Sequence, residues 1–309
     1  RSSPQWPRPG QVTQPCLGAR KLTVMTVFLY LLIPLALYMF SVFLPLVVAG
    51  FYSLFEWKGG PNKTFIGLDN YVALLNDATF RLSLNHNLIL VGLCVVGQVG
   101  IAIVFVGIIS NRFIRFKKIH RTFGFFPSTI SAVYVGFIWT MIYDSRRGLL
   151  NHFLEAIGQH DLTQVWLNNS TWIMLIVSIP LIWQYIGYYM LILLSALSSI
   201  DQEIIESAEI DGANTFQRTT QIVLPMIKST IYVCLILCVS GNMKAFDNIY
   251  VMTSGGPGND SMVMALYGYR VSFVQQNMGY GSSISVGIFV IGLIVIGAMQ
   301  LIFNRSSRE

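Results

Sequence analysis

The sequence predicts an all-α polytopic membrane protein with six transmembrane helices. Of its 309 residues, 54% are hydrophobic and only 11% are charged, and the mean hydropathy is +0.60. A soluble domain carries about 25% charged residues, and a globule this poor in charge would expose large apolar patches to water. The apolar stretches are continuous, whereas the strands of a membrane barrel alternate apolar and polar residues. Helices are therefore the expected spanning elements.

Six stretches are long enough to cross a hydrocarbon core about 30 Å thick, which takes about 20 apolar residues in a helix. The first two contain no charge, the fourth follows a run of polar residues, and the fifth contains one lysine, Lys244. The expected spans are residues 22–55, 82–111, 122–143, 172–200, 229–246 and 284–303. Residues 1–21 are then an N-terminal tail, 22–304 the transmembrane domain and 305–309 a C-terminal tail.

Lysine and arginine are distributed unevenly between the two sides of the membrane. The N-terminal tail, the loops at 112–121 and 201–228 and the C-terminal tail hold most of the 20 lysine and arginine residues. Because loops rich in these residues stay in the cytoplasm, both chain ends are expected there. The basic loop at 112–121 is interpreted as a topology signal that touches anionic lipid headgroups, and no nucleic-acid partner is expected.

The fourth connection, residues 201–225, differs from the other cytoplasmic loops because it is rich in acids. Asp201 can cap a helix N-terminus, and Ile204, Ile205 and Ala208 share one face of the helix that follows. Gly212 permits the left-handed backbone that ends a helix. A second short helix is expected over 215–223. The pattern indicates a compact helix-turn-helix that serves as a docking element rather than a solvated loop.

This loop carries a resemblance to a known family. Glu206-Ser-Ala208, Gly212 and Ile222-x-Leu224-Pro225 have the spacing of the EAA loop of bacterial ABC importer permeases. Ser207 departs from the usual alanine, and Asp201 stands where relatives often have proline. Further segments resemble the carbohydrate-uptake branch in the same order along the chain: 65–71, 126–127, 138–139, 143–144, 148–151, 183–197 and 246–257. The chain is similar to the larger maltose permease subunit and its relatives, which are type I importer permeases.

The resemblance implies partners and a mechanism. The chain would lie in the bacterial inner membrane beside a second permease subunit, usually a homologue. Two cytoplasmic subunits would bind ATP and magnesium, and an extracellular binding protein would deliver a sugar for translocation by alternating access. The chain itself contains no GxxxxGK[ST] loop and no HExxH motif, so we expect no cofactor, no metal site and no enzymatic activity of its own.

The resemblance also assigns residues to two sites. The coupling residues, which would sit in a groove of one ATPase subunit, are Glu206, Ser207, Ala208, Ile210, Asp211, Gly212 and Ala213. Glu206 is the candidate for an ion pair there. The substrate-contact candidates are Trp183, Tyr185 and Asn242, with Ser128 a weaker match. Aromatic residues and amides suit sugar rings and hydroxyl groups, although aromatics at these depths also serve as packing or as an interfacial belt.

Two alternatives remain open at this stage. The same machinery could carry a polyol or a glycerol phosphodiester, but a phosphate would favour arginine in the cavity, and the outer arginines lie at span ends. A secondary transporter would need ionisable residues near the middle of the membrane, and Lys244 is the one charged residue inside an expected span.

We interpret Lys244 as a side chain that snorkels to the outer headgroups, with a gating role as the alternative. An intramembrane enzyme would need paired acids or metal ligands within spans, and the sequence has none.

Overall fold

The computed structural model describes residues 17–110 and 116–306. Residues 1–16 of the expected N-terminal tail, residues 111–115 of the basic loop and residues 307–309 of the C-terminal tail lie outside the described residues. The chain divides into two compact units, Arg1–Phe51 and Tyr52–Glu309.

The described part of the first unit, from Leu17 onward, is one long apolar helix. α1 (Leu17–Tyr38) continues through a π-helical turn, Met39–Phe43, into α2 (Leu44–Tyr52). Thr26–Tyr52 has the length and hydropathy of a membrane span, and none of its most apolar window is buried within the chain. The helix begins before the expected start at Leu22, because the preceding alanine, arginine and lysine favour helix.

Three helices of the second unit are long and apolar enough to cross a membrane. The second span consists of α4 (Ala78–Cys94), a π-helical segment (Val95–Gly100) and α5 (Ile101–Ser110). The fourth span is α9 (Ile173–Leu197), and the last is α16 (Met278–Ser306). These helices match the expected spans to within a few residues at most ends.

The third span is bent within its expected range, and a second bend precedes the helix of the fifth span. α6 (Lys117–Phe125) and a short 3₁₀ turn (Phe126–Thr129) meet α7 (Ala132–Ile142) at 98°. The helical segment Arg218–Met226 meets α13 (Lys228–Met243) at 71°. The described part of the chain therefore has four candidate spanning helices, or six if each bent pair counts as one span.

The bend in the third span follows from its sequence and its neighbours. Pro127 favours the tight turn at its position, and Ile130 has an extended backbone that interrupts the helix. The Gln184 side chain of α9 donates its amide to the Ile130 carbonyl oxygen at 2.9 Å. A buried amide thus satisfies a backbone group that the broken helix leaves free.

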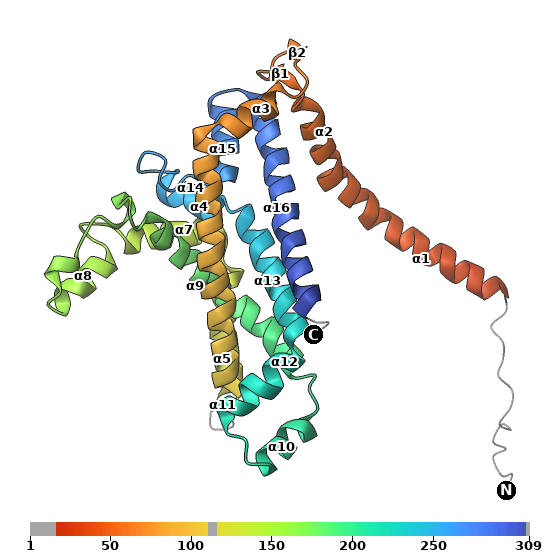
Figure 1. Ribbon diagram of the computed structural model, residues 1–309, viewed down its shortest axis with the longest axis vertical. Coiled ribbons are helices and arrows are strands. Elements are labelled where there is room, and N and C mark those ends of the chain that lie inside the picture. The colour runs from red at the N-terminus through yellow and green to blue at the C-terminus, as the bar shows by residue number, and fades with distance from the viewer. Residues whose placement is uncertain (1–16, 111–115, 307–309) are drawn as a thin grey trace, which may run out of the picture. The chain divides into compact units, whose positions relative to one another are not determined.

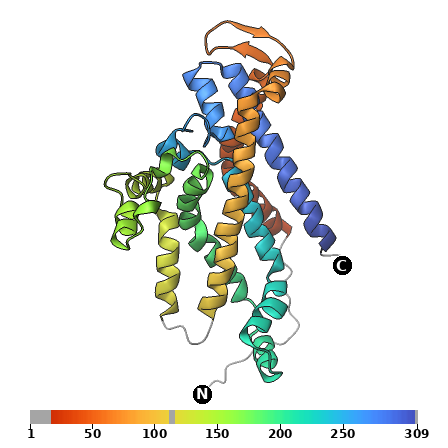
Figure 2. The ribbon, with the colours of Figure 1, turned by 60° about the vertical axis from the view of Figure 1, so that its left-hand side comes forward.

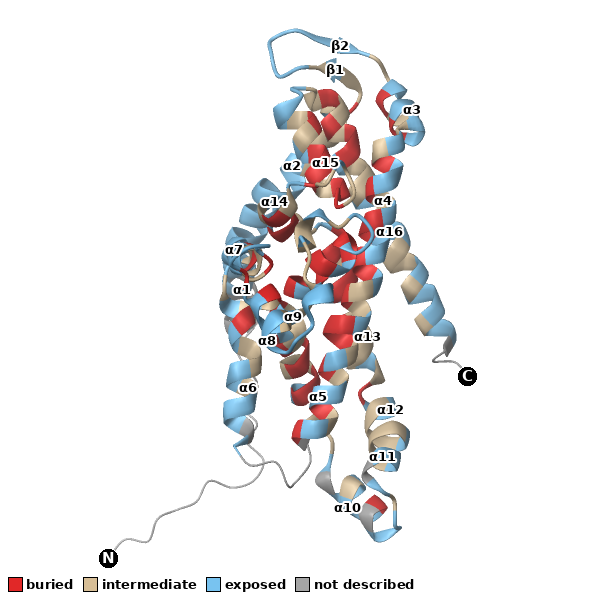
Figure 3. Ribbon diagram, turned by 90° about the vertical axis from the view of Figure 1, so that its left-hand side faces the viewer, coloured by how far each residue is buried: buried red, intermediate tan, exposed pale blue. Residues whose placement is uncertain are grey.

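The core of the second unit is built around α9. Helices α4, α5, α6 and α13 all pack against it, and Figure 3 shows buried residues concentrated along α9 and α13. A Cβ atom at Gly187 would overlap the backbone carbonyl of Gly124 in α6. The two helices can approach this closely because Gly187 has no side chain.

Short elements cover the expected outer end, and the acidic loop lies at the opposite end (Figures 1 and 2). Strands β1 (Phe55–Trp57) and β2 (Lys63–Phe65) form an antiparallel hairpin with Phe55 opposite Phe65. Three short helices complete the outer end. They are α3 (Asp69–Asn76), α14 (Asp247–Thr253) and α15 (Met264–Tyr269), with a π-helical turn at Arg270–Val274. Between the third and fourth spans lies α8 (Leu149–Ala156).

Candidate functional site

The first half of the acidic loop forms the expected helix. α10 (Gln202–Ile210) begins where the Asp201 carboxylate accepts the backbone N–H of Glu203 at 3.1 Å. It ends at Gly212, whose φ of +83° lies in the left-handed region that favours glycine. Ala208 is buried and Ile205 half-buried, but Ile204 is exposed and does not share the inward face predicted for it.

The second half of the loop is longer than expected. α11 (Thr215–Gln217), the π-helical segment Arg218–Val223 and α12 (Leu224–Met226) follow one another without a gap, so helical backbone continues past the predicted end at residue 223. Asn214 and Gln217 each accept the other's backbone N–H through their side chains at 2.9 Å, which is a capping box. This pair fixes where the second helix begins.

The seven predicted coupling residues lie together on this element. Glu206, Ser207, Ile210, Asp211 and Gly212 are exposed, Ala213 is half-buried and Ala208 is buried. Phe216 of α11 is exposed as well. The element therefore presents exposed carboxylates, Glu206 among them, together with exposed apolar side chains, which is the mixture of groups found in protein interfaces.

A second candidate site is a cavity of about 420 Å³ among the fourth and fifth spans and α14. It brings together Tyr185 of α9 and Asn242 of α13, two of the residues predicted to contact substrate. Tyr188 and Tyr189 supply further aromatic groups, and Phe246 lies between the fifth span and α14. The cavity thus offers aromatic faces and amides in a mostly apolar wall.

Buried amides connect the wall of this cavity. Gln98 donates to the Leu181 carbonyl oxygen at 3.0 Å and accepts from the Asn242 amide at 3.3 Å. Asn242 also donates to the Cys238 carbonyl oxygen at 2.8 Å. The nitrogen of Asn242 is therefore already bonded within the protein.

Asn248, at the start of α14, differs from the other amides. Its nitrogen donates to Gln184 Oε1 at 3.4 Å, whereas its Oδ1 is buried without a hydrogen-bond partner. The residue is 2% exposed and lines the cavity. A buried acceptor left unpaired costs about 1–3 kcal/mol.

Lys244 lies at the cavity rather than inside a spanning helix. The fifth span was expected to reach residue 246, but α13 ends at Met243. The end is set by Asn87 of α4, whose side-chain nitrogen donates to the carbonyl oxygens of Asn242 and Met243, both at 3.2 Å. Lys244 and Asp247 both line the cavity as a result.

The other two predicted contact residues lie outside this lining. Trp183 packs edge-to-face against Trp139 with ring centroids 6.1 Å apart. The Ser128 hydroxyl donates to the Phe125 carbonyl oxygen at 2.7 Å, within its own turn. Their assignment to the substrate rests on the resemblance alone and stays a prediction.

Sequence reasoning missed Gln98 and Asn248 as members of the cavity wall. For Gln98 a signal was present, because an amide within an apolar span is costly unless it has a partner. Gln98 lies in an expected span. Asn248 follows the fifth span and carried no such signal. Among the residues that the structure describes, no cluster of three histidine, cysteine or acidic side chains could hold a metal ion.

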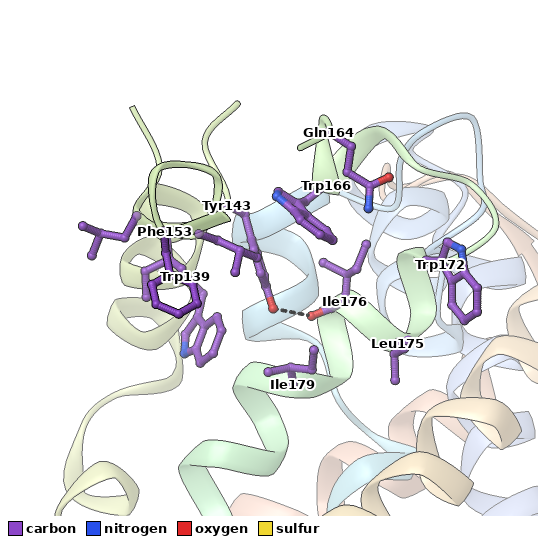
Figure 4. A pocket seen from close by; sticks show the side chains of 12 residues that line it. Trp139, Tyr143, Phe153, Gln164, Trp166, Trp172, Leu175, Ile176 and Ile179 are labelled. Carbon is purple, nitrogen blue, oxygen red and sulfur yellow. Dashed lines mark hydrogen bonds between the residues drawn. The ribbon is translucent and has the colours of Figure 1, made fainter. Parts of the chain in front are cut away.

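A larger cavity of about 660 Å³ lies at the outer ends of the third and fourth spans (Figure 4). Its walls are almost entirely aromatic and aliphatic. Tyr143 crosses it and donates its hydroxyl to the Ile176 carbonyl oxygen at 3.2 Å. That carbonyl lies one helical turn before Pro180, which has no N–H to bond it. Pro180 therefore leaves the Ile176 carbonyl oxygen without its helical partner, and Tyr143 satisfies it.

Comparisons with known proteins agree with this architecture. Residues 98–308 match the family model described as binding-protein-dependent transport system inner membrane component. The chain is 32% identical to the probable ABC transporter permease protein YurN of Bacillus subtilis, over 90% of this chain and 96% of that protein. It is also 32% identical to the diacetylchitobiose uptake system permease protein NgcF of Streptomyces coelicolor, over 93% of this chain and 85% of that protein.

A solved structure shares the fold. It is the bacterial alginate ABC transporter in complex with an alginate-pentasaccharide-bound periplasmic protein, one chain of which matches with a TM-score of 0.81 at 22% identity. The match covers 94% of this chain and 97% of that chain. The fold of this chain therefore also occurs in a chain of a solved bacterial ABC transporter.

Proposed function

Because the chain belongs to the family of inner membrane components of binding-protein-dependent transport systems, we propose that it is a permease subunit that translocates a sugar or oligosaccharide. The observation that carries the proposal is the cavity between α9, α13 and α14, which is lined by Tyr185, Asn242 and Asn248. Sugar hydroxyl groups form hydrogen bonds with amides, and the tyrosine faces suit sugar rings.

The charges at the cavity favour an uncharged ligand. Lys244 and Asp247 both line it and have opposite formal charges. A phosphodiester would gain from Lys244 but would be repelled by Asp247, whereas a neutral polyol or sugar can bond to both side chains. The substrates that the names of similar permeases give, which include diacetylchitobiose and multiple sugars, support the carbohydrate class.

The loop 201–225 is proposed to couple this cavity to ATP hydrolysis in two partner subunits. α10 follows α9 after four residues, so the docking element is attached directly to a helix that carries the cavity wall. Glu206 would form an ion pair in a groove of one ATPase, with Ile210 and Phe216 adding apolar contacts. Removing one partner of a buried ion pair at an interface costs about 2–5 kcal/mol.

The partner subunits and the transport cycle are proposed from what is general for this family of importers. A second permease subunit completes the translocation path, and an extracellular binding protein delivers the ligand. ATP-driven closure of the two ATPase subunits opens the cavity outward, and hydrolysis returns it to face the cytoplasm. The two chain ends and the coupling loop then lie on the cytoplasmic side.

The ATPase rate of the complex reconstituted in liposomes tests the proposal. We expect binding protein loaded with one sugar of a panel to stimulate the rate, and Glu206→Ala to abolish most of that stimulation. Glu203→Ala, which removes another exposed carboxylate of α10, is the matched control. A full response in the Glu206 variant would remove this residue from coupling. The importer proposal fails if no ATPase subunit copurifies and the chain alone moves solute down an ion gradient.

The same assay tests the cavity. Asn248→Leu keeps the volume but removes the acceptor, and we expect sugar transport to fall about 3–10-fold, the loss of one hydrogen bond of about 0.5–1.5 kcal/mol. Asn248→Asp keeps an acceptor oxygen and is expected to retain more transport. Equal transport by wild type and Asn248→Leu would exclude a contact between this residue and the substrate.

A further inference from the structure

The aromatic cavity at the outer ends of the third and fourth spans has the wrong chemistry for a sugar. Its aromatic walls include Trp139, Tyr143 and Trp166, and Gln164 is its amide-bearing member. The polar atoms of two of these aromatic side chains are hydrogen-bonded within the protein. The Tyr143 hydroxyl donates to the Ile176 carbonyl oxygen, as described above, and Trp166 Nε1 donates to Asn151 Oδ1 at 2.8 Å. The cavity therefore presents hydrocarbon surface (Figure 4).

Apolar side chains continue from this cavity onto the surface. Leu149 and Phe153, which line the cavity, are 71% and 61% exposed, and Ile157 is 55% exposed. These residues follow one another at four-residue spacing and so lie along one face of α8 and its last turn. Such a stripe is unfavourable in water but stable when a helix lies at the boundary between headgroups and acyl chains.

The position of the cavity agrees with this boundary. Its walls come from the end of α7 and the start of α9, which are the expected outer ends of two spans. Tryptophan and tyrosine are enriched at that depth of a bilayer. Figures 1 and 2 show α8 projecting from the side of the helix bundle beside α7. The opening is thus at the edge of the bundle rather than on its axis.

Two exposed arginines lie next to the apolar stripe. Arg146 and Arg147 form the turn that leads into α8, and their backbone N–H groups bond to the Asp144 carboxylate at 2.9 and 2.7 Å. These bonds fix the turn but leave the guanidinium groups exposed. Guanidinium groups bind phosphate with several hydrogen bonds, and this pair stands two or three residues before Leu149.

We propose that this cavity holds one acyl chain of an outer-leaflet phospholipid whose phosphate is bound by Arg146 and Arg147. The apolar walls match the chain, the exposed stripe of α8 matches the bilayer around it, and the arginines match the headgroup. α8 then lies on the membrane surface as an anchor for the loop between the third and fourth spans. This role is independent of which solute the permease carries.

Tryptophan quenching by brominated lipid tests the occupant. The assembled transporter is placed in nanodiscs of phosphatidylglycerol with or without bromine midway along one acyl chain. The fluorescence of Trp166 is the difference between wild type and Trp166→Phe, and we expect bromine to quench it strongly. Trp57, in the outer hairpin, gives the matched control through Trp57→Phe and should not be quenched. An unquenched Trp166, which a protein segment filling the cavity would also produce, overturns the proposal.

Native mass spectrometry of the complex in detergent tests the headgroup site. The double variant Arg146→Gln, Arg147→Gln is expected to lose one retained phosphatidylglycerol that the wild type holds. Arg81 is an exposed arginine on the expected outer side and is distant in sequence from this pair. Arg81→Gln is therefore the control and should keep the bound phosphatidylglycerol. Equal lipid retention in the double variant and the wild type would contradict the assignment of the phosphate to these arginines. Sugar-stimulated ATPase activity in the same samples reports separately on the transport function.

Discussion

Asn87 joins three elements of the second unit through one fully buried side chain. Its nitrogen donates to the carbonyl oxygens of Asn242 and Met243 at the end of α13, and its Oδ1 accepts the backbone N–H of Met264 at 2.8 Å. The first contact stops the fifth span before Lys244, and the second holds the start of α15. Replacing Asn87 with alanine removes all three hydrogen bonds.

The size of the effect follows from these partners. A net hydrogen bond contributes about 0.5–1.5 kcal/mol, and within membranes the measured average is about 0.6 kcal/mol. The Asn242 carbonyl oxygen keeps a second donor, the Ala245 N–H at 3.2 Å, so losing its hydrogen bond from Asn87 costs the least of the three. The Met264 N–H loses its acceptor in a buried position, which costs about 1–3 kcal/mol. We expect Asn87→Ala to lower the free energy of unfolding by about 2–4 kcal/mol.

The assay is SDS titration of the purified full chain in lipid–detergent micelles, followed by tryptophan fluorescence. Asn76→Ala is the control, because the exposed Asn76 amide makes one local bond to the Val72 carbonyl within α3. It should change the unfolding free energy by less than about 0.5 kcal/mol. A similarly small change for Asn87→Ala would refute the reasoning, since the three bonds would then contribute nothing to stability.

Three further predictions follow from buried contacts. The Asp77 carboxylate is partly buried, which alone raises its pKa, but hydrogen bonds from two tyrosine hydroxyls and two backbone N–H groups outweigh burial and lower the pKa below its ordinary value of 3.8. This stabilisation is therefore complete above about pH 4 and lost as the pH falls through the lowered pKa, and pH-dependent unfolding should show that Asp77→Asn removes the acid-sensitive part. Gly187→Ala should destabilise the chain by about 1–3 kcal/mol through overlap with the Gly124 backbone, and unchanged thermal stability would contradict the close approach. Tyr143→Phe should cost about 1 kcal/mol in the wild type but little in a Pro180→Ala background, where the helix regains the missing N–H; a double-mutant cycle with no coupling would argue against this pairing.

The conformation of the proposed coupling loop could be predicted in large part from the sequence, because interactions between residues close in sequence determine it. Asp201 caps α10 and Gly212 ends it in a left-handed conformation, as short-range chemistry predicts. The capping box of Asn214 and Gln217 follows the same kind of rule and was present in the sequence without being used. The outward position of Ile204 depends on what packs beside the helix, which spacing alone does not give.

The helix bends and the cavity were harder to predict from the sequence, because they depend on contacts between residues that are far apart in the chain. An apolar stretch shows that a segment can enter the membrane but not that its helix breaks, as the third span does near Ile130. Gln184 supports that break from another helix, and Asn87 ends α13 from a third. Asn242 and Tyr185 were found through resemblance, whereas Asn248 required the arrangement of α14 against α9.

The attachment of the coupling loop at both of its ends has a mechanical consequence. One end continues α9, which carries Gln184 and Tyr185, and the other leads through a 71° bend into α13, which carries Asn242. At about 1.5 Å per residue, the 25 residues of α9 form a lever arm of about 37 Å. A tilt of about 10° moves the far end of such an arm by about 6 Å. A force applied to the proposed coupling loop would therefore reach α9 and α13 together, the two helices that supply Tyr185 and Asn242 to the cavity.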